Sequence, residues 1–463
     1  MSHDSRPYSV SRRQVLSGTT AAALAGLAGC SEGGNGNDGN GNDTGNGNDD
    51  GNGSNNDNGS TDQSVDLTAW TFAIHTNAAQ ALVEQYDANN VEVVDQPPGD
   101  VGDKLVTSLQ AQTDLPSISM LRNNILKTVS RSGGMLRISD VIQEHEDRLF
   151  TVSKSLHTVD GDWFSFPNDL GPFVLYYNAD IFSEIGLPTE PDAVEDEFQT
   201  WDDYIAAGQQ WQDETNNGFL QMPGESAANG IMPAIQTQVG GRYYNDSGEF
   251  TFKQEANVRA YEIGKQLFDI AEPEGWFSSQ WFDNFREGNV PTLPGPAWLT
   301  GIIKPNLEGM SGDWRVAVLP AAEQGGARGS NFGGASAGVP LAIQGDERSA
   351  ALDWGQFWHL SEASFNEKIK AGAFPAIKPE GAEQANATEA FFGGQQHVQR
   401  FVSAAEECPP QYARPSRRAQ NFSRNATRRI LSDGQPIQEV LDDVHEQILN
   451  DLDEEDKQVE PVN

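Results

Sequence analysis

From residue 65 onward, the hydrophobic pattern of this 463-residue chain alternates between short apolar runs and longer amphipathic segments. The first short runs predict strands, at residues 66–72, 91–95 and 116–120. The longer segments repeat their apolar positions with a helical period and predict helices, at residues 78–88 and 101–112. This order of elements is typical of a parallel β-sheet covered by helices, so an α/β fold is expected.

Sheets of this kind bind ligands just beyond the carboxyl ends of their strands. Trp70, Phe72 and His75 stand at the end of the first predicted strand, and Arg122 and Asn123 follow the third. These side chains are therefore the first candidates for contact with a ligand.

The most informative stretch lies in the middle of the chain. A segment rich in Pro, Gly, Asn and Asp, residues 166–172, predicts a turn, and the apolar and aromatic run at 173–177 predicts a strand buried on both faces. Asn178 is a good N-cap for a helix that follows at once. Asn168 and Asp169 would lie in the turn and join the candidate ligand contacts.

The later part of the chain continues with the same two kinds of segment. Strands are expected at residues 219–222, 290–293, 315–319 and 339–343, the last at the end of a chain crossing that begins at residue 333. Helices are expected at residues 201–216, 256–270, 279–287, 350–360 and 364–370.

The run at 166–188 resembles the hinge region of the family 1 extracellular solute-binding proteins of ABC importers. Further segments resemble signatures of that family, in its order: Trp201-Asp202-Asp203-Tyr204, Gly295-Pro296-Ala297-Trp298, Trp314-Arg315-Val316-Ala317-Val318-Leu319-Pro320 and Gly372-Ala373-Phe374-Pro375. The resemblance implies a two-lobed, periplasmic-binding-protein-like fold of type II whose lobes are joined by hinge crossings. It also implies the division of the folded part: residues 65–172 plus 335–376 in lobe 1, and 173–334 plus 377–455 in lobe 2.

In the sugar-binding members of this family, a tryptophan in the Gly-Pro-x-Trp context stacks on a sugar ring. The resemblance therefore makes Trp298 a candidate ligand contact, and Phe374 completes the set as part of the return segment. Packing in the core is the alternative for Trp298, as it is for Trp354 and Trp358, which are spaced i, i+4 on an apolar helical stripe.

The N-terminal residues predict export and anchoring. Arg12 and Arg13 precede a short apolar stretch and resemble a twin-arginine signal, and Leu27-Ala28-Gly29-Cys30 resembles a lipobox. Residues 1–29 would then be removed and Cys30 lipidated. Residues 30–64, almost wholly Gly, Asn, Asp and Ser, cannot bury a core and predict a disordered tether, and 456–463 is an acidic tail.

The charge balance narrows the possible partners. The formal net charge is −38, and only 10 of the 30 basic residues are Lys, which favours a protein of high-salt environments and disfavours nucleic acid as a partner. Cys408 would remain as a lone, structural thiol. No H-E-x-x-H motif or Cys pair with metal-ligand spacing occurs, so neither a metal nor another cofactor is expected.

One segment leaves an enzymatic alternative open. Residues 334–338 match the G-x-S-x-G pattern of a hydrolase nucleophile, but that motif requires a helix after the serine, whereas Val339-Pro340-Leu341 continues a strand. The favoured interpretation is a monomeric, lipid-anchored solute-binding protein on the outer face of the cytoplasmic membrane. It would bind a small solute, expected to be a carbohydrate, and deliver it to ABC permease subunits without making or breaking a bond. A secreted hydrolase or a surface protein with the same anchor is the alternative.

Overall fold

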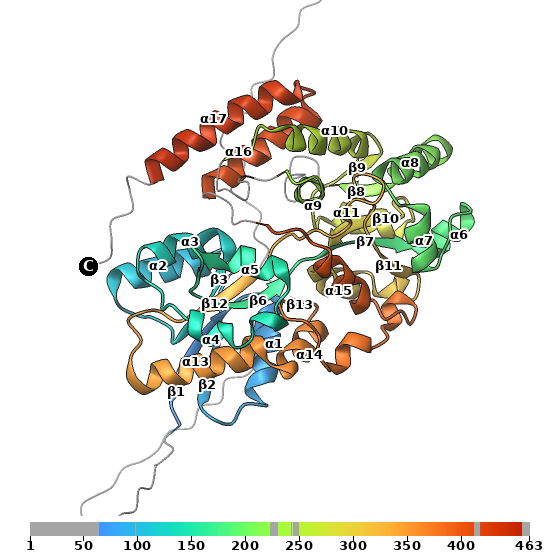
Figure 1. Cartoon of the computed structure of the whole chain (residues 1–463). Coiled ribbons are helices and arrows are strands. Elements are labelled where there is room, and N and C mark those ends of the chain that lie inside the picture. The colour runs from blue at the N-terminus through green and yellow to red at the C-terminus, as the bar shows by residue number, and fades with distance from the viewer. Residues whose placement is uncertain are drawn as a thin grey trace, which may run out of the picture. The chain divides into compact units, whose positions relative to one another are not determined.

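Two β-sheets organise the folded part of the chain (Figure 1). A computed structural model describes residues 64–97, 99–222, 230–241, 243, 250–411 and 417–455. The first sheet has six strands in the order β13 (Phe374–Pro375), β6 (Phe166–Leu170), β12 (Ala335–Gly338), β3 (Ile118–Arg122), β1 (Asp66–Thr71) and β2 (Asn90–Asp95). The second has five, in the order β11 (Trp314–Val318), β7 (Phe173–Asn178), β10 (Thr292–Pro296), β8 (Leu220–Met222) and β9 (Ala271–Pro273). A hairpin of β4 (Thr158–Val159) and β5 (Asp162–Trp163) stands apart.

The first part of the first sheet has the β-α-β order expected from the sequence. Strand β1 pairs in parallel with β2 and β3. The helices that accompany this sheet in sequence are α1 (Ile74–Val83), α2 (Val101–Ala111), α3 (Asn123–Arg131), α4 (Ser139–Gln143), α5 (Thr151–His157), α13 (Gly345–Leu360) and α14 (Glu362–Lys370). Strand β3 runs two residues later than predicted, so Arg122 is its last residue and Asn123 opens α3.

Helix α1 begins four residues before its predicted start and ends five before its predicted end. Its last turn tightens, because Gln85 and Tyr86 donate backbone hydrogen bonds only three residues back. Tyr86 also packs on Trp354 of α13, and its hydroxyl donates to Asp353. A tertiary contact that the local sequence does not encode therefore ends the helix.

The segment predicted as a turn is instead a strand. Residues Phe166–Leu170 form β6, which is buried throughout and pairs antiparallel with β12 and β13. Asn168 and Asp169 consequently lie inside the sheet, which corrects the prediction that they stand in a turn. Pairing with two strands distant in sequence overrides the local preference of Pro, Asn and Asp for turns.

Strand β7 is buried on both faces, as predicted. Val174 and Tyr176 belong to one hydrophobic cluster, whereas Phe173, Leu175 and Tyr177 belong to the other. The two-residue period of a strand thus divides the core at β7. Asn178 then caps the next helix, because its side chain accepts a hydrogen bond from Ile181 N.

The remaining helices accompany the second sheet. They are α6 (Ala179–Glu184), α7 (Pro191–Glu197), α8 (Trp201–Thr215), α9 (Met232–Gln238), α10 (Glu255–Asp269), α11 (Ser279–Arg286), α12 (Thr300–Asn306), α15 (Val398–Glu406), α16 (Arg417–Thr427) and α17 (Ile437–Glu455). Helices α16 and α17 lie beside α10 in Figure 1. Within the described ranges, no helix combines the length and apolar character that crossing a membrane requires.

The chain passes between the two sheets where side chains would not fit. A Cβ atom at Gly171, between β6 and β7, would lie 2.1 Å from Phe332 O, and one at Gly334, before β12, would lie 3.0 Å from Asp169 O. Ser336 lies within β12, which has a strand on each side. The small residues at 333–338 therefore fill a close-packed crossing. The strand predicted at 339–343 is not formed, because β12 ends at Gly338. Since α13 begins only at Gly345, no helix follows Ser336 directly, as a nucleophilic serine requires.

Candidate functional site

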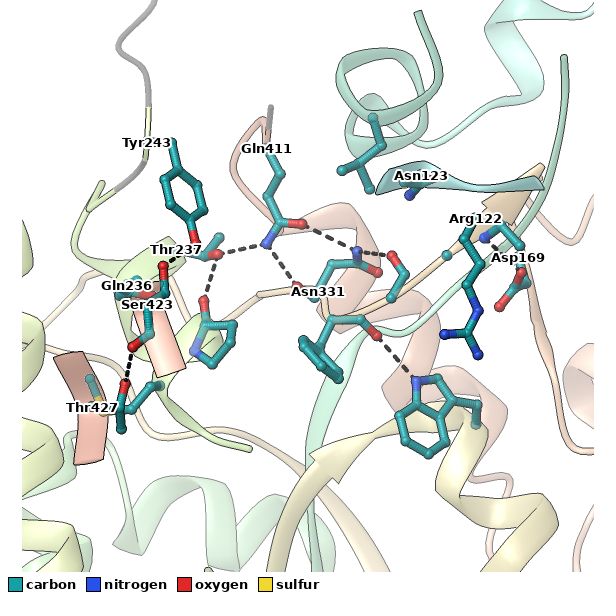
Figure 2. A pocket seen from close by; sticks show the side chains of 18 of the residues that line it. Arg122, Asn123, Asp169, Gln236, Thr237, Tyr243, Asn331, Gln411, Ser423 and Thr427 are labelled. Atoms are coloured by element: carbon teal, nitrogen blue, oxygen red, sulfur yellow. Dashed lines mark hydrogen bonds between the residues drawn. The ribbon is translucent and has the colours of Figure 1, made fainter. Parts of the chain in front are cut away.

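A cavity of about 590 Å³ is lined by residues from the elements of both sheets. This volume lies within the range of ordinary small-molecule sites. Figure 2 shows two groups of polar side chains on opposite sides, with Asn331 and Gln411 between them. We call the group Arg122, Asn123, Asp169 and His75 the first-sheet wall, and the group Gln236, Thr237, Tyr243, Ser423 and Thr427 the second-sheet wall.

The first-sheet wall lies at the ends of three strands, β1, β3 and β6, the last of which contains Asp169. His75 stands in the first turn of α1, directly after β1, and Arg122 and Asn123 stand where β3 passes into α3. The guanidinium of Arg122 lies over the Phe72 ring, 5.5 Å from its centroid. Asn123 Oδ1 is buried and has no hydrogen-bond partner among the described residues. It is thus a buried, unpaired acceptor in a residue that lines the cavity.

A buried hydrogen-bonded network lies beneath this wall, with Asn168 at its centre. The Asn168 side-chain amide donates to Asp169 Oδ1 at 3.0 Å and to His75 Nδ1 at 3.2 Å. Its amide oxygen lies 3.0 Å from His359 Nδ1, which must donate, and its backbone oxygen accepts from Lys368 Nζ at 3.0 Å. Asp169 Oδ1 also accepts from the backbone N–H of residue 335 at 3.0 Å.

Burial shifts the pKa values of the bases in this network downward. Desolvation lowers the pKa of Lys368 to about 7, against the opposing attraction of Asp169. Desolvation also lowers the pKa of His75 and of His359, and it lowers the pKa of His157, whose Nδ1 bonds Ser153 O, to about 4. The three histidines are therefore neutral in the folded protein at neutral pH.

The second-sheet wall contains hydroxyl and amide groups without formal charge. Tyr243 Oη and Ser423 Oγ share a short hydrogen bond. Thr427 Oγ1 lies 3.0 Å from Tyr261 Oη, and Gln236 Nε2 donates to Asn257 Oδ1 at 3.0 Å. Such groups both donate and accept hydrogen bonds, which suits a ligand rich in hydroxyl groups.

Gln411 connects the two sides of the cavity. Its side-chain amide donates to Thr237 Oγ1 at 2.6 Å and to Asn331 O at 2.8 Å, while its backbone N–H donates to Ser155 Oγ in α5 at 2.9 Å. Asn331 Oδ1 in turn accepts from Gly171 N at 2.7 Å. These bonds tie the polar floor of the cavity to the chain crossings.

Aromatic rings supply the apolar part of the cavity. Trp298 stands in a 3-10 turn (Ala297–Leu299) directly after β10, is half-buried, and donates from Nε1 to Phe332 O at 3.1 Å. Its ring centroid lies 5.7 Å from that of Trp276 and 6.5 Å from that of Phe332. Phe277, next to Trp276, also lines the cavity.

The structure brings six of the predicted contacts together at the cavity: Phe72, His75, Arg122, Asn123, Asp169 and Trp298. The other three lie in the core. Trp70 is buried beneath Lys104, whose ammonium lies 4.1 Å from the ring centroid, and Phe374 packs between Phe150 and Phe401. Asn168 is fully buried and reaches the cavity only through Asp169 and His75.

The remaining predictions concern the export and lipidation residues, the lone thiol and metal sites. Cys30, Arg12 and Arg13 lie outside the described residues. Cys408 is a free, buried thiol. Among the described residues, no group of three or more His, Cys, Asp or Glu side chains could hold a metal ion.

The second-sheet wall was not predicted from the sequence. Its residues come from helices α9 and α16 and from Tyr243, which lie far apart in the chain. The hydroxyl groups of Ser423 and Thr427, spaced i, i+4 on one helix face, were the available signal.

Comparisons with known proteins agree with this architecture. The arabinooligosaccharide-binding protein of Halalkalibacterium halodurans is 25% identical over 325 residues, which are 66% of this chain and 69% of that protein. The lactose-binding protein of Rhizobium radiobacter is 25% identical over 405 residues, 84% of this chain and 93% of that protein. The solved structure of the sugar-binding protein MalE from Xanthomonas citri superposes with a TM-score of 0.70 at 16% identity, covering 86% of this chain and all of that one.

The structural likeness confirms the two-lobed fold predicted from the sequence. The family model of the bacterial extracellular solute-binding proteins matches residues 77–391, more than half of the chain. The chain therefore belongs to the family of bacterial extracellular solute-binding proteins.

Proposed function

We propose that this protein is the substrate-binding component of an ABC transporter and that its ligand is a neutral oligosaccharide. The observation that carries the proposal is the pairing, in one cavity, of half-buried Trp298 with an uncharged wall of hydroxyl and amide groups. A sugar ring presents an apolar C–H face to an aromatic side chain and hydroxyl groups to its other neighbours, so both parts of the cavity have a counterpart in a sugar. The relatives that bind arabinooligosaccharides and lactose support this class of ligand.

We also propose the division into lobes that the resemblance in sequence implies, with residues 65–172 and 335–376 in one lobe and 173–334 and 377–455 in the other. The ligand contacts both and so stabilises the closed arrangement selectively. Binding and release leave the ligand chemically unchanged. A hydrolytic activity would instead convert an oligosaccharide during incubation, which chromatography of the recovered ligand detects.

A thermal-shift screen in high salt tests the ligand class. The probes are mono- and oligosaccharides, sugar acids, polyamines and peptides. A ligand at about 100 times its dissociation constant adds about 2.7 kcal/mol to the stability, which raises the melting temperature by a few degrees. We expect a shift with oligosaccharides. A shift with sugar acids alone would assign Arg122 to a carboxylate, and a shift with polyamines alone would contradict the proposal.

We also propose that the protein is a monomer held at the outer face of the cytoplasmic membrane by a lipid on Cys30, after export through the Arg12-Arg13 signal. The order of these motifs and the tether at 30–64 support this location. Cys30→Ser should release the protein into the medium or leave it as an unprocessed precursor. A processed, lipid-free Cys30→Ser protein that stays with the membrane would contradict the lipid anchor.

A further inference from the structure

We propose that Phe277 forms a second aromatic platform of the cavity and selects ligands of at least two sugar rings over monosaccharides. The inference rests on the proposed function, since it assumes that the cavity takes a sugar. It assigns to Phe277 a role separate from that of Trp298: Trp298 holds one ring of the ligand, and Phe277 holds another.

The exposure of Phe277 is the first observation. Phe277 is 41% exposed and lines the cavity. Among the described residues, the only other large hydrophobic residue so exposed is Leu341, which does not line the cavity. Burial of the apolar surface of a phenylalanine is favourable, so an exposed phenylalanine lacks this stabilisation. A ligand ring that covers it would recover this free energy.

The backbone at Phe277 is the second observation. Ser278 N donates to Gly275 O at 3.2 Å, which closes a four-residue turn with Phe277 at its third position. Phe277 has φ of +64°, in the left-handed region that glycine or asparagine ordinarily takes at this position of a turn. A bulky aromatic residue is strained there, and such strain persists only where the surroundings impose it.

The surroundings of the turn hold Phe277 in place. Glu274 Oε1 accepts hydrogen bonds from Gly275 N at 3.1 Å and from Ser278 Oγ at 3.0 Å. Ser278 Oγ also caps α11 by accepting from Trp281 N at 3.1 Å. The Phe277 ring meets the rings of Trp276 and Trp281 edge-on, with centroids 5.4 Å and 5.6 Å away. The side chain is thus supported on one side and open toward the cavity on the other.

The arrangement of the three aromatic rings determines how many sugar rings a ligand needs in order to contact both platforms. Trp276 contacts both Phe277, at 5.4 Å between centroids, and Trp298, at 5.7 Å. Trp276 itself is not among the residues that line the cavity, so the two accessible rings are separate surfaces joined behind by a third. One sugar ring stacks on one aromatic ring, whereas a ligand of two or more sugar rings can use both surfaces.

Substitution at Phe277 tests the proposal, because stability and affinity should change in opposite directions. Glycine relieves the strain at a positive φ and removes the platform. We expect Phe277→Gly to keep or raise the melting temperature of the unliganded protein. Its affinity for oligosaccharides should fall at least tenfold while its affinity for the monosaccharide stays within twofold, and Phe277→Tyr should retain oligosaccharide binding.

The probes are arabinose with arabino-oligosaccharides of two to four units and glucose with the corresponding malto-oligosaccharides, measured by isothermal titration calorimetry. Phe277→Asn, which also tolerates a positive φ, should reproduce the result. Gln112→Gly is the matched control, because Gln112 also has a positive φ, of +52°, but lies outside the cavity lining. It should keep or raise the melting temperature and leave every affinity unchanged.

Two results would contradict the proposal, and they are distinguishable. If the wild-type protein binds oligosaccharides and Phe277→Gly binds them equally well, or loses the monosaccharide to the same extent, the second platform is wrong and the proposed function stands. If the wild-type protein binds none of the sugars, the proposed ligand class fails and this inference fails with it.

Discussion

The two walls of the cavity differ in chemistry, although both present polar side chains to the same space. The first-sheet wall rests on buried ionisable groups that bind one another through Asn168. The second-sheet wall contains hydroxyl and amide groups that carry no charge at any ordinary pH. The comparison suggests a division of tasks: the first wall couples its own stability to pH, and the second recognises hydroxyl groups by contacts that do not titrate.

Acidification should have the largest effect on the stability of the protein, because it acts on the buried histidines near the first-sheet wall. Burial lowers the pKa of His157 to about 4. Between pH 6.5 and 4 the unfolded chain therefore binds a proton that the folded protein does not, so stability falls as the pH falls and this loss is complete below about pH 4. The cost is about 3 kcal/mol for His157 alone, with further loss from His75 and His359, whose pKa values burial also lowers.

Urea unfolding across this pH range measures the effect. His157→Gln should remove its share of the pH dependence, whereas His145→Gln, which replaces a partly exposed histidine, should retain the full slope. A wild-type stability that is constant from pH 6.5 to 4 would show that the histidines of the first-sheet side are not held neutral by burial.

Removal of the network's centre should have the next largest effect. Asn168→Ala leaves Asp169, His75 and His359 without a shared partner in a buried site, so we expect a loss of about 2 to 3 kcal/mol in the free energy of unfolding. Thr427→Val in the second-sheet wall leaves one buried group, the Tyr261 hydroxyl, without its partner and should cost only about 1 kcal/mol. Equal losses for the two variants, measured by urea unfolding at neutral pH, would contradict the difference between the walls.

Substitution of Trp298 tests whether this residue contacts the ligand or packs in the core. Because the side chain is half-buried and lines the cavity, Trp298→Ala should weaken oligosaccharide binding at least tenfold, or about 1.4 kcal/mol, and cost the unliganded protein about 1 to 2 kcal/mol. Calorimetric titration and urea unfolding measure the two quantities. A loss of about 3 to 5 kcal/mol in the unliganded protein, with binding retained, would instead assign Trp298 to the core.

Substitution of Gln411 should have the smallest effect, because Gln411 connects the two walls and is part of neither. Gln411→Ala removes the hydrogen bonds to Thr237 and Asn331 but leaves the backbone bond to Ser155. We expect the affinity for an oligosaccharide to fall by a few fold, or about 1 kcal/mol, equally at pH 6 and pH 8, since these groups do not titrate there. An affinity loss at one pH only would mean that the second-sheet side is coupled to the ionisable network.

Much of the fold follows from local patterns in the sequence. The two-residue and helical periods predicted β1, β2, β7, α2 and α8 within one or two residues, because each of these elements buries one or both faces in the manner its own sequence encodes. Strand β6 was not predictable in the same way. Its Pro, Asn and Asp residues favour a turn locally, and only pairing with β12 and β13 makes them a strand.

The candidate site, like the fold, was predictable from the sequence only in part. The sequence by itself determined that Arg122, Asn123 and Trp298 lie at or just after strand ends, where a sheet of this kind places its ligand, because strand ends can be recognised from neighbouring residues. Only the tertiary structure decided that Trp70, Asn168 and Phe374 lie in the core, and that residues of α9 and α16, nearly two hundred positions apart, form one neutral wall. Those outcomes depend on which elements pack together, and no local period records the partner of a buried face.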